Sequence, residues 1–261
     1  MKLADLLRDV PVRELRGDAN AEITSVTPDS RLVTKGALFV AIPGTAKDGA
    51  QFVPQAKEKG AAAIVAQSGD ATVLVDDARA ALALIAANFY GRPAGRLSLV
   101  GVTGTSGKTT TTRMIEAVFD APVNGVAAPV GLIGTIEYRA GDERLTADRT
   151  TPDAVVLQEW FAKMVEAGVK HAVMEVSSHA LALKRTHGVH FAAAVFTNLS
   201  REHFDFHKDF EDYFGAKKIL FDQIDRSRRT AVVTTRKSWN SAEKSRPGVT
   251  PRRWFNTSGV Y

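Results

Sequence analysis

One junction near the middle of the chain constrains the fold more than any other feature. Residues 97–102 are largely apolar, which is typical of a buried strand, and residues 108–119 have the pattern of a helix. The turn between them reads Gly104-Thr105-Ser106-Gly107-Lys108-Thr109-Thr110. Backbone N–H groups at such a helix start can hold a phosphate, helped by roughly +0.5 of helix-dipole charge. The junction therefore predicts a phosphate-binding loop in an α/β fold.

The loop departs from the common phosphate-loop pattern at one position. That pattern has a glycine five residues before Gly-Lys-Thr, where this chain has Val102. The chemistry is still present, because Lys108 would reach the β- and γ-phosphates and the Thr109 hydroxyl would bind Mg²⁺. A turn that merely caps a helix is the alternative. Gly-Lys-Thr-Thr between a strand and a helix favours phosphate binding.

Strand and helix patterns alternate on both sides of this junction. Before it, strands are predicted over 37–42, 61–66 and 72–75, with helices over 51–59 and 76–90. After it, strands are predicted over 132–138, 171–176, 192–197 and 230–233, with helices over 153–167 and 210–224. Such alternation predicts parallel sheets with helices on both faces.

The segment Gly91-Arg92-Pro93-Ala94-Gly95 is the best linker in the chain. We therefore predict an N-terminal domain over residues 1–95 and a central domain over 96–234. Residues 235–261 have no sustained apolar period and are predicted to be an irregular tail. The C-terminal part of the chain is basic: from Arg226 onward, nine Lys or Arg residues stand against one acid, so the residues before Arg226 are slightly acidic although the chain is +5.

Charge and composition exclude several classes of protein. The confinement of the positive excess to the residues from Arg226 onward argues against nucleic-acid binding by the rest of the chain. The chain has no cysteine, so it has no disulfide framework and no thiolate metal site. No run approaches the roughly 18–20 apolar residues that span a bilayer. We expect a cytoplasmic monomer without nucleic-acid or membrane partners.

Further motifs, in a fixed order, resemble those of the Mur ligase family, the ATP-dependent enzymes that build the peptidoglycan peptide. After the loop these are Thr150-Thr151-Pro152, Glu175-Val176-Ser177-Ser178-His179-Ala180-Leu181, Thr197-Asn198-Leu199-Ser200-Arg201-Glu202-His203 and Tyr213-Phe214-Gly215-Ala216-Lys217. Before it, Asp29-Ser30-Arg31 and Gly36-Ala37-Leu38-Phe39-Val40-Ala41 resemble the family's nucleotide-sugar-binding domain. The Ser-Ser-His element resembles the tripeptide-synthesising branch.

The resemblance implies an amide-bond ligase that uses ATP and Mg²⁺. In the family reaction the γ-phosphate moves to a substrate carboxylate, and an amine then displaces phosphate from the acyl phosphate. The implied partners are UDP-MurNAc-L-Ala-D-Glu and a free amino acid, with meso-diaminopimelate the commoner choice and lysine the alternative. The implied fold class is α/β: a small nucleotide-sugar-binding domain, then a phosphate-loop domain with a mostly parallel sheet.

The resemblance also implies roles for individual residues. Catalytic roles fall to Lys108, His203 and Lys217, the last as a carbamylated lysine. Nucleotide contacts fall to Asn198 and the loop residues Gly104, Thr105, Ser106, Gly107, Lys108, Thr109 and Thr110. The implied metal ligands are Thr109, Glu175, His203 and Lys217. Substrate contacts fall to Ser30, Thr150, Thr151, Ser177 and Arg185.

Each assignment has a plainer alternative. Glu175 ends a predicted strand, where ligands collect in open α/β sheets, but an acid there can also cap a helix. His203 is a metal ligand, an ordinary surface histidine, or part of a zinc site with Asp205 and His207. Lys217 would look the same as any lysine on an amphipathic helix. The serines and threonines also suit turns and caps.

The family pattern ends after Val233, where the basic tail begins. We therefore expect that the family's C-terminal ligase domain is missing, as in a truncated or frameshifted product with impaired activity. Three functions remain open: a tripeptide ligase, a non-catalytic protein that binds ATP or the UDP-sugar, and another phosphate-loop NTPase such as a kinase or a switch.

Overall fold

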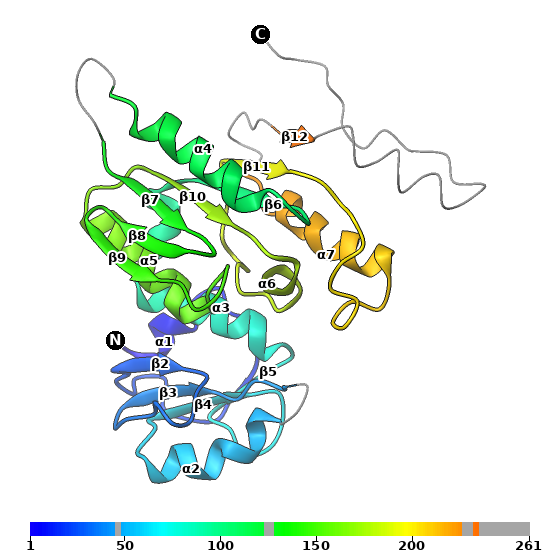
Figure 1. Ribbon diagram of the computed structural model, residues 1–261. Helices are drawn as coiled ribbons and strands as arrows, with labels where there is room; N and C mark the ends of the chain where they lie inside the picture. Colours follow the sequence, from blue (N-terminus) through cyan, green and yellow to red (C-terminus); the bar gives the residue numbers. More distant parts are fainter. Residues whose placement is uncertain (45–47, 123–127, 226–231, 235–261) are drawn as a thin grey trace.

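The computed structural model describes residues 1–44, 48–122, 128–225 and 232–234. Within them the chain forms two sheets, one of five strands and one of seven (Figure 1). The first lies between residues 12 and 75 and the second between 98 and 234. Most strand pairs in both are parallel, which confirms the predicted α/β class. The division at residue 95 stays a prediction, and the tail over 235–261 lies outside the described residues.

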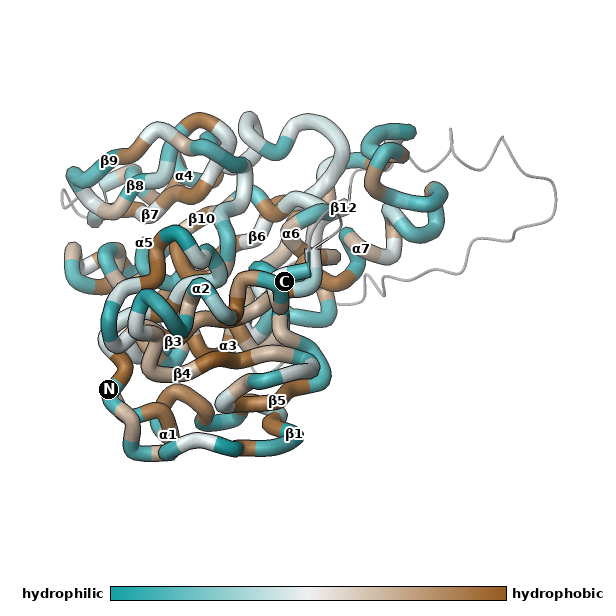
Figure 2. The backbone as a smooth tube through the Cα atoms, turned by 90° about the horizontal axis from the view of Figure 1, so that it is seen from below, coloured by the Kyte–Doolittle hydropathy of each residue, from teal (hydrophilic) through white to brown (hydrophobic). Residues whose placement is uncertain are grey.

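The N-terminal sheet has the order β1-β5-β4-β3-β2. Its strands are β1 (Val12–Leu15), β2 (Ser25–Thr27), β3 (Ala37–Val40), β4 (Ala63–Ala66) and β5 (Val73–Val75). Its helices are α1 (Leu3–Leu6), α2 (Val53–Glu58) and α3 (Ala78–Phe89), with 3₁₀ turns at Gly49–Phe52 and Pro93–Arg96. Alternate strand residues pack on opposite faces: Leu38 and Val40 lie in the core with α1 and α3, and Phe39 in the core with α2. Figure 2 shows α3 as a mainly hydrophobic segment, as this burial requires.

The central sheet has the order β12-β11-β6-β10-β7-β8-β9. Its strands are β6 (Ser98–Thr103), β7 (Val130–Ile133), β8 (Glu137–Ala140), β9 (Glu143–Thr146), β10 (His171–Glu175), β11 (Ala193–Phe196) and β12 (Val232–Thr234). Its helices are α4 (Lys108–Asp120), α5 (Ala154–Glu166), α6 (Ser178–Ala182) and α7 (Phe210–Asp222). Strand β6 is flanked by β10 and β11, so the segment after β6 lies beside the ends of both.

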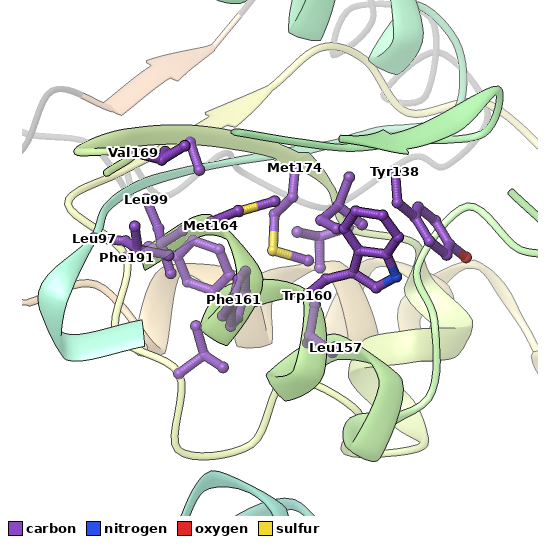
Figure 3. Close-up of a cluster of buried hydrophobic side chains, with 14 of the residues drawn as sticks. Leu97, Leu99, Tyr138, Leu157, Trp160, Phe161, Met164, Val169, Met174 and Phe191 are labelled. Atoms are coloured by element: carbon purple, nitrogen blue, oxygen red, sulfur yellow. The ribbon is translucent and has the colours of Figure 1, made fainter. Parts of the chain in front are cut away.

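Helices cover both faces of the central sheet, as predicted. On one face, Val100, Val102 and Val173 pack against Ile115 and Phe119 of α4. The larger core lies on the other face, where the side chains come from β6, β10, α5, α6 and α7. Figure 3 shows its Phe161, Met164 and Met174 packed together below the sheet. This core fixes β6 and β10, the strands that lead into the candidate site.

The prediction of one strand over residues 132–138 was wrong in one respect. The chain turns after β7 and returns antiparallel as β8, with Ile133 paired to Tyr138. Gly134 begins the turn, and its N–H donates to the Glu137 carbonyl at 3.1 Å. The sequence did not reveal this turn, because the run is apolar and a glycine within a strand pattern is also compatible with a bulge in one continuous strand.

The two sheets are joined through side chains. Ala154 and Val155, at the start of α5, pack in the core of the N-terminal sheet. Lys184 forms an ion pair with Asp77, the residue that caps α3. Helices α3 and α5 pack against each other. Among the described helices, none is long and apolar enough to cross a bilayer.

Candidate active site

The loop between β6 and α4 depends on two glycines with positive φ angles. Gly104 has a φ of 144° and Gly107 a φ of 81°. A Cβ on Gly104 would lie 1.9 Å from the Thr197 hydroxyl, so only glycine fits there. Gly107 is the residue before α4, which begins at Lys108 as predicted. The sequence pattern thus corresponds to a tight turn that directs the backbone into a helix.

The N-terminus of α4 differs from those of the other long helices. Helices α3, α5 and α7 each begin with an aspartate whose carboxylate accepts two backbone N–H groups: Asp77, Asp153 and Asp209. No side chain caps α4, and its first turn contains no acid. Its first N–H groups therefore keep the positive end of the dipole available for an anion, which is the arrangement of a phosphate site.

Two lysines converge on one carbonyl of this loop. The Lys108 Nζ donates to the Gly104 and Thr105 carbonyls at 2.9 and 2.8 Å. The Lys217 Nζ, on α7, also donates to the Gly104 carbonyl, at 2.9 Å. Burial, and then the nearby charge of Lys108, lower the pKa of Lys217 to about 7. Burial also lowers the pKa of Lys108. Lys217 is therefore partly neutral at physiological pH, as a lysine that reacts with carbon dioxide must be.

Tyr213 connects Lys217 to the loop. Its ring lies beneath the Lys217 Nζ, 4.4 Å from the ring centroid. Its hydroxyl lies 3.1 Å from the Thr105 hydroxyl, and the Tyr213 side chain is fully buried. Thr105 in turn accepts the Ser200 N–H at 2.9 Å. The loop is thus held in place by α7 and by the segment after β11.

Asn198 also holds the loop. Its amide makes two hydrogen bonds with Ser106: Oδ1 accepts the backbone N–H at 2.9 Å, and Nδ2 donates to the carbonyl at 3.0 Å. The Thr197 hydroxyl donates to the same carbonyl at 2.6 Å. Asn198 therefore lies at the loop as expected, and the contacts it makes there are with protein atoms. Its contact with a nucleotide stays a prediction.

Glu175 ends β10, next to the point where β6 enters the loop. Its carboxylate is 1% exposed and accepts the Thr109 hydroxyl at 3.0 Å. It also accepts the Thr135 N–H at 2.9 Å and the Thr135 hydroxyl at 3.1 Å. All the hydrogen-bond donors described for this carboxylate are neutral. A buried carboxylate beside a hydroxyl, with no cation paired to it in the described part of the chain, suits a hard divalent cation.

His203 lies at the edge of this arrangement. Its φ is 60°, its ring is 4.9 Å from the His179 ring and 6.0 Å from the Tyr213 ring, and its side chain is 39% exposed. No described hydrogen bond joins it to Glu175 or to Thr109. The structure therefore brings two of the four predicted metal ligands into contact, and places the other two around Tyr213. Among the described residues, no group of three His, Cys, Asp or Glu is placed to hold a metal.

The predicted substrate residues of the central sheet form one connected group. The Thr151 hydroxyl donates to the Glu175 carbonyl at 2.8 Å and accepts the Ser177 N–H at 3.1 Å. Arg185 donates to the Thr151 carbonyl at 2.8 Å, and the Thr150 and Thr135 hydroxyls lie 3.1 Å apart. The Ser177 hydroxyl caps α6, so the plainer prediction for serine also holds there. This group lies directly beside the candidate metal site.

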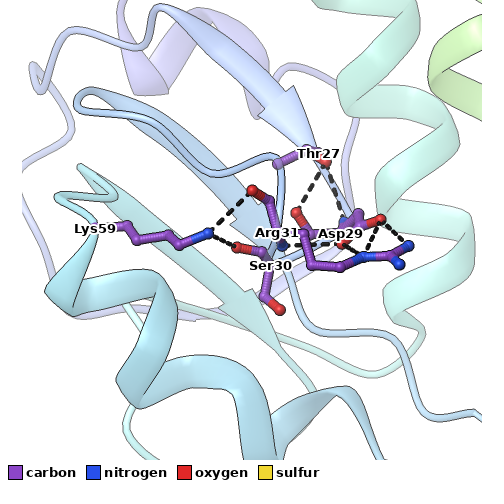
Figure 4. A network of polar contacts seen from close by, with 5 residues as sticks. All are labelled: Thr27, Asp29, Ser30, Arg31 and Lys59. Carbon is purple, nitrogen blue, oxygen red and sulfur yellow. Dashed lines mark hydrogen bonds and ion pairs between the residues drawn. The ribbon is translucent and has the colours of Figure 1, made fainter.

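Ser30 lies in the other sheet, after β2. The Ser30 carbonyl accepts the Lys59 Nζ at 3.0 Å, and the neighbouring Asp29 and Arg31 form an ion pair at 2.6 Å (Figure 4). The Ser30 side chain itself is 7% exposed. No described hydrogen bond joins Ser30 to the loop or to the Thr151 group. Its role in substrate binding stays a prediction.

Comparison with known families identifies this arrangement. The family model for the Mur ligase middle domain matches residues 102–250, and the model for the Mur ligase family catalytic domain matches residues 22–90. The chain belongs to the Mur ligase family. The middle-domain match runs past residue 233, where the order of the motifs led us to end the resemblance.

Two of the curated relatives carry the same name. UDP-N-acetylmuramoyl-L-alanyl-D-glutamate–2,6-diaminopimelate ligase from Chlorobium phaeobacteroides is 46% identical over 234 residues, covering 86% of this chain and 45% of the relative. The ligase of the same name from Chlorobaculum tepidum is 49% identical over 213 residues, covering 79% and 41%. The chain thus spans a little under half the length of these Mur ligases.

Solved structures support the fold. A structure of a diaminopimelate ligase of the same name matches with a TM-score of 0.74 at 23% identity, covering 95% of this chain and 50% of the other. MurF from Acinetobacter baumannii matches with a TM-score of 0.60 at 19% identity, covering 93% and 51%. At these identities the likeness concerns the fold of Mur ligases alone.

Two residues of this Mur ligase site were not predicted from the sequence. Thr135 was hidden inside a predicted strand, although Gly134 before it was a signal for a turn. Tyr213 belonged to a quoted motif without a role, because a contact with Thr105, far away in sequence, cannot be read from spacing. Both residues contact groups that the sequence did identify.

Proposed function

We propose that this chain binds ATP and UDP-MurNAc-L-Ala-D-Glu as part of an ATP-dependent ligase that adds meso-diaminopimelate in peptidoglycan synthesis. The main support is the position of the phosphate loop. It leads into the uncapped N-terminus of α4 and lies against Glu175 and the hydrogen-bonded group around Thr151. The relatives are named as ligases of UDP-N-acetylmuramoyl-L-alanyl-D-glutamate and 2,6-diaminopimelate. These names support the proposed acceptor and favour diaminopimelate over lysine as the amino acid.

The loop would hold the ATP phosphates through the N–H groups at the start of α4. Lys108 would release its two carbonyl contacts and turn toward the β- and γ-phosphates. Glu175 and the Thr109 hydroxyl fit Mg²⁺ as ligands, with His203 and a carbamylated Lys217 as the further groups implied by the family. The cation would neutralise charge on the phosphate oxygens.

The acceptor would lie on the side of Thr150, Thr151, Ser177 and Arg185. Burial lowers the pKa of Arg185, yet the guanidinium stays charged, so it can pair with a phosphate or a carboxylate. Because Thr151 bonds the backbone of Glu175, an acceptor held there would be next to the γ-phosphate. Phosphoryl transfer consists mainly of such positioning and charge neutralisation.

A coupled assay of ADP release tests the proposal with UDP-MurNAc-L-Ala-D-Glu, with and without meso-diaminopimelate. A ligase releases ADP only with both the acceptor and the amino acid. A second candidate, binding without turnover, is worth testing because the chain spans 45% of the Chlorobium phaeobacteroides ligase; it predicts calorimetric binding of both ligands and no ADP. ATP consumption without the acceptor would instead favour another phosphate-loop NTPase.

A further inference from the structure

Thr135 stands between the two halves of the proposed site. It lies in the turn between β7 and β8, where its side chain is exposed. Its N–H and its hydroxyl contact the Glu175 carboxylate at 2.9 and 3.1 Å. The same hydroxyl lies 3.1 Å from the Thr150 hydroxyl. Thr135 thus touches both the carboxylate beside the phosphate loop and a hydroxyl on the acceptor side.

The hydroxyl of Thr135 cannot satisfy both neighbours as a donor. A threonine hydroxyl has one hydrogen to donate and two lone pairs that accept. The Thr135 hydroxyl is placed to donate either to the Thr150 hydroxyl or to the Glu175 carboxylate, so these two oxygens compete for its one hydrogen. A ligand that binds the Thr150 oxygen changes this competition, and with it the hydrogen bond from Thr135 to Glu175.

The backbone keeps the turn close to Glu175. A Cβ on Gly134 would lie 2.9 Å from the Glu175 Oε1, closer than a carbon atom can normally lie. The turn therefore approaches the carboxylate as closely as a glycine allows. Two residues in succession, Gly134 and Thr135, serve this approach, so a movement of the turn must change the environment of Glu175.

We propose that Thr135 is a positioning residue that couples acceptor binding at Thr150 to nucleotide binding at Thr109 and Glu175. The inference rests on the proposed function, because it needs two ligands on the two sides of Thr135. Coupling is reciprocal, so it is measurable from either ligand. Its size is the ratio of the nucleotide Kd without the acceptor to the Kd with it.

Calorimetry on the full chain measures this ratio with Mg²⁺ and β,γ-imido-ATP, in the absence and presence of saturating UDP-MurNAc-L-Ala-D-Glu. We expect the ratio to differ from one by about fivefold or more in the wild type, as is usual for coupled sites. Thr135→Val keeps the shape and the N–H but removes the hydroxyl, and should bring the ratio to within about twofold of one. Thr135→Ser restores a hydroxyl and should restore the ratio.

Thr146→Val is the matched control, because Thr146 is an exposed threonine on β9 in the same hairpin region. It should keep the wild-type ratio. A wild-type ratio of one, an unchanged ratio in Thr135→Val, or a loss that Thr135→Ser fails to restore would each overturn the coupling while both ligands still bind. A wild-type chain that binds neither ligand would overturn the proposed function as well, so the two failures are distinguishable.

Discussion

Replacing Lys217 by methionine should stabilise the chain at neutral pH. Lys217 is 1% exposed, and burial followed by the charge of Lys108 lowers its pKa from 10.5 to about 7. Folding therefore favours the neutral amine, whereas the unfolded chain keeps the proton up to about pH 10.5. This difference in pKa lowers the free energy of unfolding by about 5 kcal/mol, and the whole penalty applies below pH 7.

The sign and size of the pH dependence follow from the same two pKa values. Between pH 7 and pH 10.5 the unfolded state binds more protons, so the stability of the wild type rises with pH. The penalty is about 4 kcal/mol at pH 7 and about 1 kcal/mol at pH 9.5. The substitution also removes one hydrogen bond to the Gly104 carbonyl, worth about 1 kcal/mol, but Lys108 still donates to that carbonyl.

Lys217→Met should therefore be about 3 kcal/mol more stable than the wild type at pH 7, and nearly equal to it at pH 9.5. Urea unfolding in buffers freed of carbon dioxide measures the two free energies, since the lysine then stays unmodified. Titrating groups that do not interact with Lys217 cancel in the difference, whereas Lys108 is coupled to it. Lys170→Met, at an exposed position before β10, is the control and should change stability by less than about 0.5 kcal/mol. A Lys217→Met variant that is less stable than the wild type at pH 7, with no pH dependence in the difference, would refute the reasoning.

Four further substitutions test the loop and the contact between the sheets. Gly104→Ala should abolish nucleotide binding and lower the melting temperature, because the added methyl group would overlap the Thr197 hydroxyl. Nucleotide titration measures the first effect and thermal unfolding the second. Tyr213→Phe keeps the ring under the lysine but loses the bond to Thr105, and should cost about 1 kcal/mol in urea unfolding. Asp77→Ala removes a helix cap and an ion pair and should cost about 1–2 kcal/mol, whereas Lys184→Ala, which loses only the partly exposed pair, should cost under about 1 kcal/mol. Equal losses for the last two would contradict the role of the cap.

The fold and the loop could be predicted because their signals are local. The positions of Glu175 and Lys108 follow from a strand end and a helix start, each visible within a short stretch of sequence. The burial of Lys217 is different, since any lysine on an amphipathic helix has the same pattern. Its environment comes from Gly104, which is 113 residues away. Sequence spacing carries no information on such a contact.

Thr135 and His203 show a second limit. Thr135 follows an apolar run, and whether that run continues or turns at Gly134 depends on the pairing of β7 with β8. For His203, a left-handed backbone and a ring contact with His179 determine its direction, and both arise from the fold of the segment after β11. Residue type and order identified the candidate ligands, but only tertiary contacts determine which of them meet.

Lys108 and Lys217 both hold the loop through one backbone carbonyl. The Gly104 carbonyl accepts a hydrogen bond from Lys108 and another from Lys217. If Lys108 turns to a phosphate, as the proposed function requires, the Gly104 carbonyl keeps Lys217 as a donor and is not left unsatisfied, which would cost about 1–3 kcal/mol. The departure of Lys108 also removes the nearest positive charge that lowers the pKa of Lys217. The binding of a phosphate by Lys108 and the charge of Lys217 are therefore linked through one backbone oxygen.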